Sequence, residues 1–137
     1  SYQEQIKNDS MLNTPPCWCI YMLGLTLDWL KEQGGIAGME QLKKERSAPI
    51  YEFLDNSRIF IPHARKDSRS DMNITFRTGD EDLDAEFVKG AVARGLLNLK
   101  GHKSVGGMRA SLYNAMPVEG VKALLEYMKE FEVTHHV

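Results

Sequence analysis

A glycine-rich run holds the residues of this chain that are best suited to bind an anion. It reads GHKSVGGMRASLYN and extends from Gly101 to Asn114. Its glycines let the backbone approach a ligand closely, and His102, Lys103 and Arg109 supply the donors that a phosphate or carboxylate needs. The run therefore predicts an anion-binding turn, although a glycine-rich hairpin whose cations face solvent has the same pattern.

The size and composition of the chain indicate one ordinary domain. It has 137 residues, 42% of them hydrophobic, which is enough to form a core without disulfides or metals. The formal net charge is −2, with no basic patch, which argues against nucleic acids and membrane surfaces as partners. Because no secretory signal pattern opens the chain and Thr26 and Asp28 interrupt its longest apolar stretch, we expect a cytoplasmic protein.

The two cysteines, Cys17 and Cys19, lie two residues apart on a predicted helix. Side chains at that spacing do not face each other, so a disulfide between them is not expected. No second group of cysteines or histidines is present to complete four metal ligands. We expect a buried pair of reduced thiols and no metal site.

Hydrophobic spacing, together with proline and glycine positions, predicts the elements that must position the anion-binding turn. It predicts helices at residues 16–33, 36–56, 81–94 and 117–131, and strands at residues 59–61, 72–76, 96–99 and 108–113. Short strands between amphipathic helices indicate an α/β protein, in the form of an α+β two-layer sandwich. Its small mixed sheet, largely antiparallel, would be covered by helices on one face, with the turn at one edge.

The first predicted helix carries an apolar stripe with large aromatic side chains. The stripe consists of Trp18, Tyr21, Met22, Leu25 and Trp29. Aromatic residues at helical spacing are typical of a core or an interface, so we expect this stripe to be covered.

Several charged groups outside the glycine-rich run are expected to lie at the surface. The KKER run at residues 43–46 predicts a solvated helix face. The polar segment at residues 62–70, with Arg65, Lys66 and Arg69, predicts a surface loop, with a ligand contact as the alternative. The histidines at residues 135–136 predict a frayed end without an acidic partner.

Three motifs carry a resemblance to a known family. They are NTPP at residues 13–16, RSDMN at residues 69–73 and GHKSVGGMRASLYNA at residues 101–115. In this order and spacing they resemble the phosphoserine aminotransferases, class-V pyridoxal-phosphate enzymes. The likeness runs from about Leu12 to the C-terminus and covers the C-terminal third of such an enzyme. It implies that residues 1–137 form one domain, the small C-terminal domain of the enzyme, with residues 1–14 as a connecting segment.

The resemblance implies a fold-type-I transferase that uses pyridoxal 5'-phosphate and works as a homodimer in serine biosynthesis. The implied reaction exchanges an amino group between glutamate and 3-phosphohydroxypyruvate, giving 2-oxoglutarate and phosphoserine. The Schiff-base lysine of the family lies upstream of NTPP, and Lys7, the one lysine there, lacks the expected surroundings. We therefore expect no catalytic residue in this chain, and neither bound cofactor nor activity when the chain is isolated.

The resemblance also implies roles for five residues. Asn13 and Thr14 would bind the phosphate of the cofactor held by the neighbouring subunit, with an ordinary helix N-cap as the alternative. Arg109 would hold the substrate α-carboxylate through two parallel hydrogen bonds. His102 would help to hold the substrate phosphate. Lys103 stands where many members have arginine, so both a phosphate contact and a solvent-facing position fit it.

Two other functions are compatible with the same residues. One is a stand-alone anion-binding or oligomerisation module with no enzyme around it. The other is a class-V aminotransferase that acts on a different substrate.

Overall fold

A computed structural model describes residues 1–135 of the chain. The chain divides into two compact units, Ser1–Met39 and Glu40–Val137. The assignment of residues 1–137 to one domain stays a prediction.

The first unit contains α1 (Tyr2–Lys7) and α2 (Cys17–Glu32), and α3 (Gly35–Asn56) begins within it. The sequence did not predict α1. Pro16 stands at the N-cap position of α2, and Gly34 and Gly35 both have positive φ at its end. These residues confirm the helix predicted between the Pro-Pro pair and the Gly-Gly pair.

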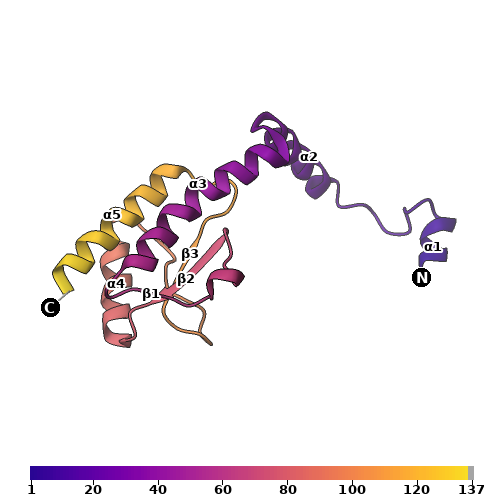
Figure 1. The fold of residues 1–137 in the computed structure, drawn as a ribbon. Helices are drawn as coiled ribbons and strands as arrows, with labels where there is room; N and C mark the ends of the chain where they lie inside the picture. The colour runs from indigo at the N-terminus through magenta and orange to yellow at the C-terminus, as the bar shows by residue number, and fades with distance from the viewer. Residues whose placement is uncertain (136–137) are drawn as a thin grey trace. The chain divides into compact units, whose positions relative to one another are not determined.

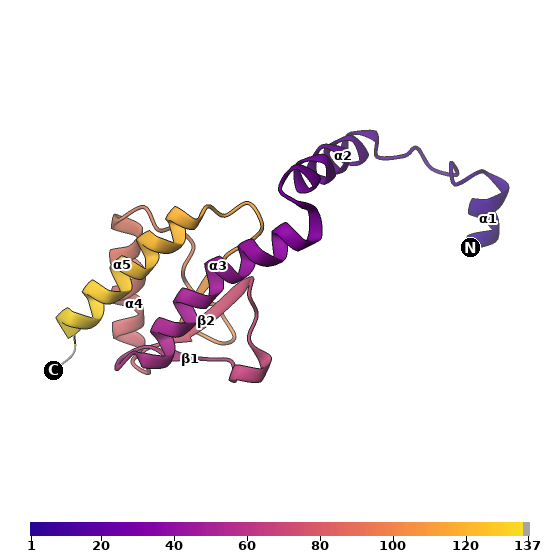
Figure 2. The same ribbon diagram turned by 45° about the horizontal axis from the view of Figure 1, so that its top comes forward.

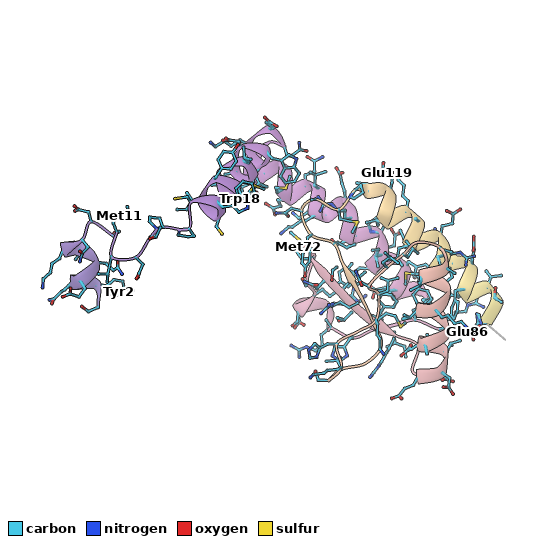
Figure 3. The ribbon with its side chains drawn as sticks, turned by 180° about the vertical axis from the view of Figure 1, so that it is seen from behind. Tyr2, Met11, Trp18, Met72, Glu86 and Glu119 are labelled. Carbon is cyan, nitrogen blue, oxygen red and sulfur yellow. The ribbon has the colours of Figure 1, made fainter. Side chains whose placement is uncertain are left out.

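The apolar stripe of α2 was expected to lie in a core or an interface, and no core covers it in this structure: Trp29 is half-buried and the other four residues of the stripe are exposed. Trp18 is 71% exposed and Tyr21 is 60% exposed, and Figure 3 shows Trp18 among the side chains on this helix. Cys17 and Cys19 are free thiols but exposed, so the prediction that they are buried was wrong. A helix buries side chains only against a second element, and no residue of α1 or α2 is buried. An interface role for the stripe stays a prediction.

The second unit combines helices with a small sheet (Figure 1). Its elements after α3 are β1 (Ile61–Pro62), the 3-10 turn η1 (Lys66–Ser68), β2 (Asn73–Arg77), α4 (Glu81–Ala93), β3 (Met108–Ser111) and α5 (Val118–His135). The strands pair in the order β1-β2-β3, and both pairings are antiparallel. Helices α4 and α5 and the part of α3 in this unit lie on one side of the sheet (Figure 2). The predicted α/β two-layer sandwich is confirmed.

Residues 96–99, predicted as a strand, form none. Asn98 has a φ of 62°, outside the extended region, and this interrupts the backbone of a strand. Pairing with β3 is limited to an isolated bridge between Lys100 and Met108 and a backbone hydrogen bond from Arg109 to Leu99.

Helix α4 shows why its ends were predictable. The side chain of Asp80 accepts hydrogen bonds from the backbone N–H groups of Asp82 and Leu83, which satisfies donors that a helix start otherwise leaves unpaired. Gly95, with a φ of 79°, follows the last turn. The prediction for residues 81–94 is confirmed.

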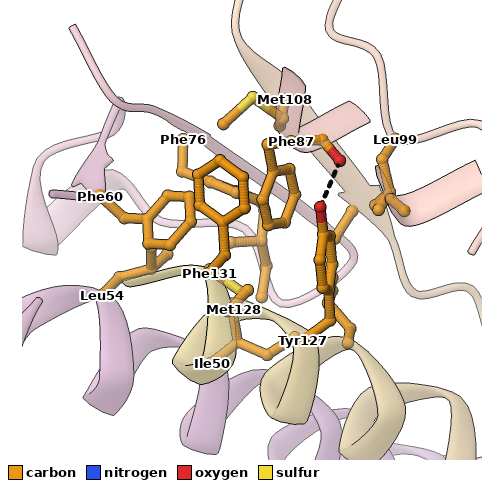
Figure 4. Close-up of a cluster of buried hydrophobic side chains, with 14 of the residues drawn as sticks. Ile50, Leu54, Phe60, Phe76, Phe87, Leu99, Met108, Tyr127, Met128 and Phe131 are labelled. Carbon is orange, nitrogen blue, oxygen red and sulfur yellow. Dashed lines mark hydrogen bonds between the residues drawn. The ribbon is translucent and has the colours of Figure 1, made fainter. Parts of the chain in front are cut away.

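An aromatic cluster forms the core between the sheet and the helices (Figure 4). Phe87 of α4 is fully buried. The centroid of its ring lies 4.7 to 6.0 Å from the centroids of four other aromatic rings. The Tyr127 hydroxyl donates a 2.9 Å hydrogen bond to the Phe87 carbonyl and so joins α5 to α4. Burial raises the pKa of that hydroxyl. The other aromatic rings of the cluster are those of Phe60, Phe76 and Phe131.

Two polar residues differ from their predicted surface positions. Arg46 is only 2% exposed, because it lies four residues before Ile50 and therefore on the inward face of α3. His135 is the last residue of α5 and has a carboxylate neighbour after all, since its Nε2 lies 3.3 Å from Glu86 Oε1. His136 lies outside the described residues.

Arg69 fastens the segment between β1 and β2 to α3. Its guanidinium donates to both carboxylate oxygens of Asp55 and lies over the ring of Tyr51, with its central carbon 4.6 Å from the ring centroid. The Tyr51 hydroxyl donates to the Ser70 carbonyl. The ligand contact considered for Arg69 is thus replaced by a structural ion pair that fixes the approach to β2.

We expect this ion pair to make stability depend on acidic pH. The hydrogen bond from Arg69 lowers the pKa of Asp55 from 3.8 to about 2. Because the folded pKa lies below the unfolded value, the contribution is complete above about pH 4 to 5 and is lost as the pH falls towards 2. Asp55→Asn should lower the free energy of unfolding at pH 7 by about 1–3 kcal/mol. Urea unfolding of both chains from pH 7 to pH 2 should show the difference shrinking, and an undiminished difference at pH 2 would contradict this account.

Candidate functional site

The sheet has a polar face, which is the face turned away from the helices. Along β2 and β3, buried apolar residues alternate with half-buried polar residues, because successive side chains of a strand point to opposite sides. The half-buried positions are Asn73, Thr75, Arg109 and Ser111. In the register of the sheet, Thr75 lies opposite Arg109 and Asn73 lies opposite Ser111. These four side chains therefore share the outer face.

Arg109 brings a positive charge to this face without an internal partner. Its backbone is held on both sides, by the pairing with Thr75 and by the hydrogen bond to Leu99. Its Nε is buried and has no hydrogen-bond partner, and among residues 1–135 no carboxylate forms an ion pair with it. A guanidinium in this state is available to an external carboxylate, which it binds with two parallel hydrogen bonds.

The turn before β3 is closed by backbone contacts. Gly101 donates to the Gly107 carbonyl at 2.8 Å, and Val105 and Gly106 both donate to the His102 carbonyl at 2.9 Å. A Cβ on Gly101 would lie 2.0 Å from the Gly106 oxygen. Only glycine fits there, so the tightness of the turn explains the first glycine of the run.

His102 has a defined orientation at the start of this turn. The Ser104 backbone N–H donates to His102 Nδ1 at 3.3 Å, and the Ser104 hydroxyl lies 2.7 Å from the same nitrogen. Because Nδ1 accepts, the proton of the neutral ring is assigned to Nε2. That N–H makes no hydrogen bond within the described part of the chain and remains a donor for a ligand.

An open cavity of about 990 Å³ lies between this turn and α4. His102, Lys103 and Lys100 line it from the turn, and Arg77 and Lys89 line it from β2 and α4. Glu81 and Asp84 of α4 also line the cavity, but no ion pair joins them or another described residue to these lysine and arginine side chains. Because four cationic side chains face two carboxylates, the lining keeps an excess of positive charge on the side of the turn. Arg109 does not line this cavity. The structure therefore places His102 and Lys103 in the lining of one cavity. Arg109 lies outside that lining, on the polar face of the sheet.

Asn13 and Thr14 belong to the first unit, just before α2. Both are exposed, and neither side chain makes a hydrogen bond to a residue in 1–135. They do not cap α2, because Pro16 holds the N-cap position and no side chain bonds there. The N-cap alternative is thus excluded, and their donors are available to an anion.

Asn73, Thr75 and Ser111 are polar members of the outer face to which the sequence reasoning gave no role. A signal for them was present, because each alternates with apolar neighbours in a predicted strand. That signal shows only which face a residue occupies, and the pairing of the two strands is needed to bring them to Arg109.

Within residues 1–135, no group of three or more histidine, cysteine or acidic side chains could hold a metal ion. No helix in the same range has the length and apolar character needed to span a bilayer.

The chain belongs to the class-V aminotransferase family, whose model, described as Aminotransferase class-V, matches residues 1–124. Its similar relatives include several bacterial phosphoserine aminotransferases. It is 55% identical over 126 residues to the phosphoserine aminotransferase of Paraburkholderia phytofirmans. This alignment covers 92% of the chain and 35% of the relative.

Solved structures agree with this likeness. The phosphoserine aminotransferase from Bacillus circulans subsp. alkalophilus superposes with a TM-score of 0.91 at 45% identity, covering 97% of this chain and 37% of that one. The PLP-bound enzyme from Trichomonas vaginalis gives 0.85 at 44% identity, covering 93% and 37%. The resemblance of the three motifs is confirmed, and the chain spans 35–37% of the length of these relatives.

Proposed function

We propose that this chain forms part of a phosphoserine aminotransferase, which transfers an amino group between glutamate and 3-phosphohydroxypyruvate. The observation that carries the proposal is the unpaired guanidinium of Arg109 on the polar sheet face, next in sequence to a basic turn. Such an enzyme handles molecules that share an α-carboxylate, and some of them also carry a phosphate. The names of the relatives support this choice of substrates.

The two parts of the site would divide the work of recognition. Arg109 would bind the α-carboxylate, which glutamate and phosphoserine have in common, and so orient either amino acid in the same way. His102 would donate a hydrogen bond from its Nε2–H group to the phosphate, and Lys103 would add a positive charge. A lysine provides this charge without the bidentate geometry of arginine.

Asn13 and Thr14 are the residues of this chain that would contact pyridoxal 5'-phosphate. Their exposed, unpaired donors fit the phosphate of the cofactor, held by the neighbouring subunit of a homodimer. When bound, the cofactor acts as the electron sink for the carbon that exchanges its amino group. This chain has no residue to which we assign the covalent attachment of the cofactor.

The further parts of the proposal concern assembly and location. The enzyme would be a cytoplasmic homodimer in serine biosynthesis, with residues 1–137 as its C-terminal domain and residues 1–14 as the connection to the cofactor domain. The exposed apolar face of α2 would pack against that domain or the partner subunit.

Assays of the complete enzyme and of the isolated chain test the proposal. The complete enzyme should form 2-oxoglutarate from glutamate and 3-phosphohydroxypyruvate, while the 137-residue chain should be inactive. The isolated chain mixed with pyridoxal phosphate should give no stoichiometric, reducible adduct. Such an adduct at one lysine would contradict the proposal, and so would a start codon at the beginning of this segment, which would favour a stand-alone module.

We expect His102→Ala in the complete enzyme to separate the two substrates. The KM for phosphoserine should rise about tenfold, because a hydrogen bond to a charged phosphate is lost, while the KM for glutamate stays the same. Steady-state kinetics with each amino acid measure both values, and His63→Ala serves as the matched control because His63 does not line the cavity. An aminotransferase with an unphosphorylated substrate should use that substrate equally well after the substitution, so unchanged KM values for both amino acids would favour that alternative.

A further inference from the structure

In the side-chain amide of Asn73, the oxygen accepts hydrogen bonds from other residues, whereas the nitrogen has no partner among residues 1–135. Its Oδ1 accepts a 3.0 Å hydrogen bond from the Ser111 hydroxyl and a longer contact, 3.5 Å, from the Tyr113 hydroxyl. The structure places the amide oxygen toward these two hydroxyls, each of which can donate to it. The Nδ2 group makes no hydrogen bond to any residue in 1–135, and it carries two donors.

The sheet register brings this amide close to Arg109. Asn73 lies directly opposite Ser111, and Arg109 lies two residues before Ser111 on β3. Diagonal positions of this kind on one face of an antiparallel pair are about 7–8 Å apart, within reach of a long side chain. The register thus places Asn73 on the same face of the sheet as the unpaired guanidinium, one diagonal position away.

The support behind Asn73 is well fixed. Buried Arg46 donates a 2.7 Å hydrogen bond to the Tyr113 carbonyl and holds the chain where it leaves β3. At the entry to β2, the Ser47 hydroxyl donates to Asp71 at 2.8 Å. Adjacent residues of α3 therefore fix the strand ends that carry Tyr113 and Asn73, which favours a preorganised amide.

We infer that Asn73 is a further substrate-binding residue, whose Nδ2 donates a hydrogen bond to the carboxylate that Arg109 grips. This inference rests on the proposed function and deepens it. A guanidinium can occupy both oxygens of a carboxylate along one edge and still leave lone pairs for another donor. Asn73 would fill one of these and fix the rotation of the carboxylate about its bond to the α-carbon.

Kinetics of the complete enzyme test the inference. Asn73→Ala should raise the KM for both glutamate and phosphoserine about tenfold with little change in kcat. Ser111→Ala should raise KM less, since the Tyr113 hydroxyl still holds the amide. Asn56→Ala, the matched substitution at the end of α3, should leave both values unchanged.

A double variant shows whether two residues hold the same group. If Asn73 and Arg109 bind one carboxylate, Asn73→Ala combined with Arg109→Lys should lose less than the product of the single effects. Asn73→Asp keeps the oxygen that accepts from Ser111 and removes the donors, so it tests the inference if the alanine variant does not fold, and KM should again rise for both substrates.

The outcomes separate this inference from the proposed function. Unchanged KM values in the Asn73 variants, or a change for phosphoserine alone, would overturn the inference while Arg109→Lys still weakens both substrates. If Arg109→Lys itself leaves both KM values unchanged, the proposed function fails together with the inference.

Discussion

Arg109→Lys in the complete enzyme should lower kcat/KM for glutamate and for phosphoserine alike, by about 10- to 100-fold. Lysine keeps the positive charge but cannot make two parallel hydrogen bonds, and a hydrogen bond to a charged group contributes about 1.5–3 kcal/mol. Both amino acids carry the carboxylate that this side chain would bind, so both should lose affinity. Steady-state kinetics in both directions of the reaction measure the effect.

The control for this prediction is Arg94→Lys. Arg94 follows α4, pairs with Glu130 of α5 and lines neither the polar sheet face nor the basic cavity. The same chemical change there should leave kcat/KM unaltered. Loss of only one substrate in Arg109→Lys would refute a shared carboxylate contact.

Phe87→Ala should have the largest effect on folding. The Phe87 ring has no exposed surface and contacts the other rings of the core, so its removal leaves a cavity among them. The free energy of unfolding should fall by about 3–5 kcal/mol. Urea unfolding followed by circular dichroism measures this change.

Val92→Ala tests whether the effect depends on burial. Val92 lies on the same helix and is 52% exposed, so its truncation should change the free energy of unfolding by no more than about 0.5 kcal/mol. Similar losses for both variants would show that α4 propensity, and not the aromatic core, determines stability.

The sequence predicted the parts of the fold that local chemistry determines. Asp80 and Gly95 delimit α4 through their own hydrogen bonding and backbone freedom, and the Pro-Pro and Gly-Gly pairs delimit α2 in the same way. The predicted β2 and β3 were found because apolar and polar residues alternate in them.

Features that depend on contacts between distant segments were not predictable in the same way. A run of four charged residues at positions 43–46 suggested a solvated face, but Arg46 is buried, and its guanidinium reaches the Tyr113 carbonyl, 67 residues away. Cys17 and Cys19 looked buried because apolar residues surround them in sequence, yet burial depends on a second layer. The residues of the polar sheet face could be identified one strand at a time, whereas their assembly around Arg109 required the register.

The closure of the turn by Gly101 and Gly107 has a consequence for which of its positions can accept other residues. A Cβ on Gly107 would lie 2.6 Å from the Phe76 carbonyl oxygen, so the base of the turn admits no side chain at either glycine. The exposed tip, with Lys103 and Val105, has no such restriction. Substitutions at the tip should therefore leave the backbone of the turn unchanged. The charge and length of a single side chain there can vary while the rest of the domain stays the same.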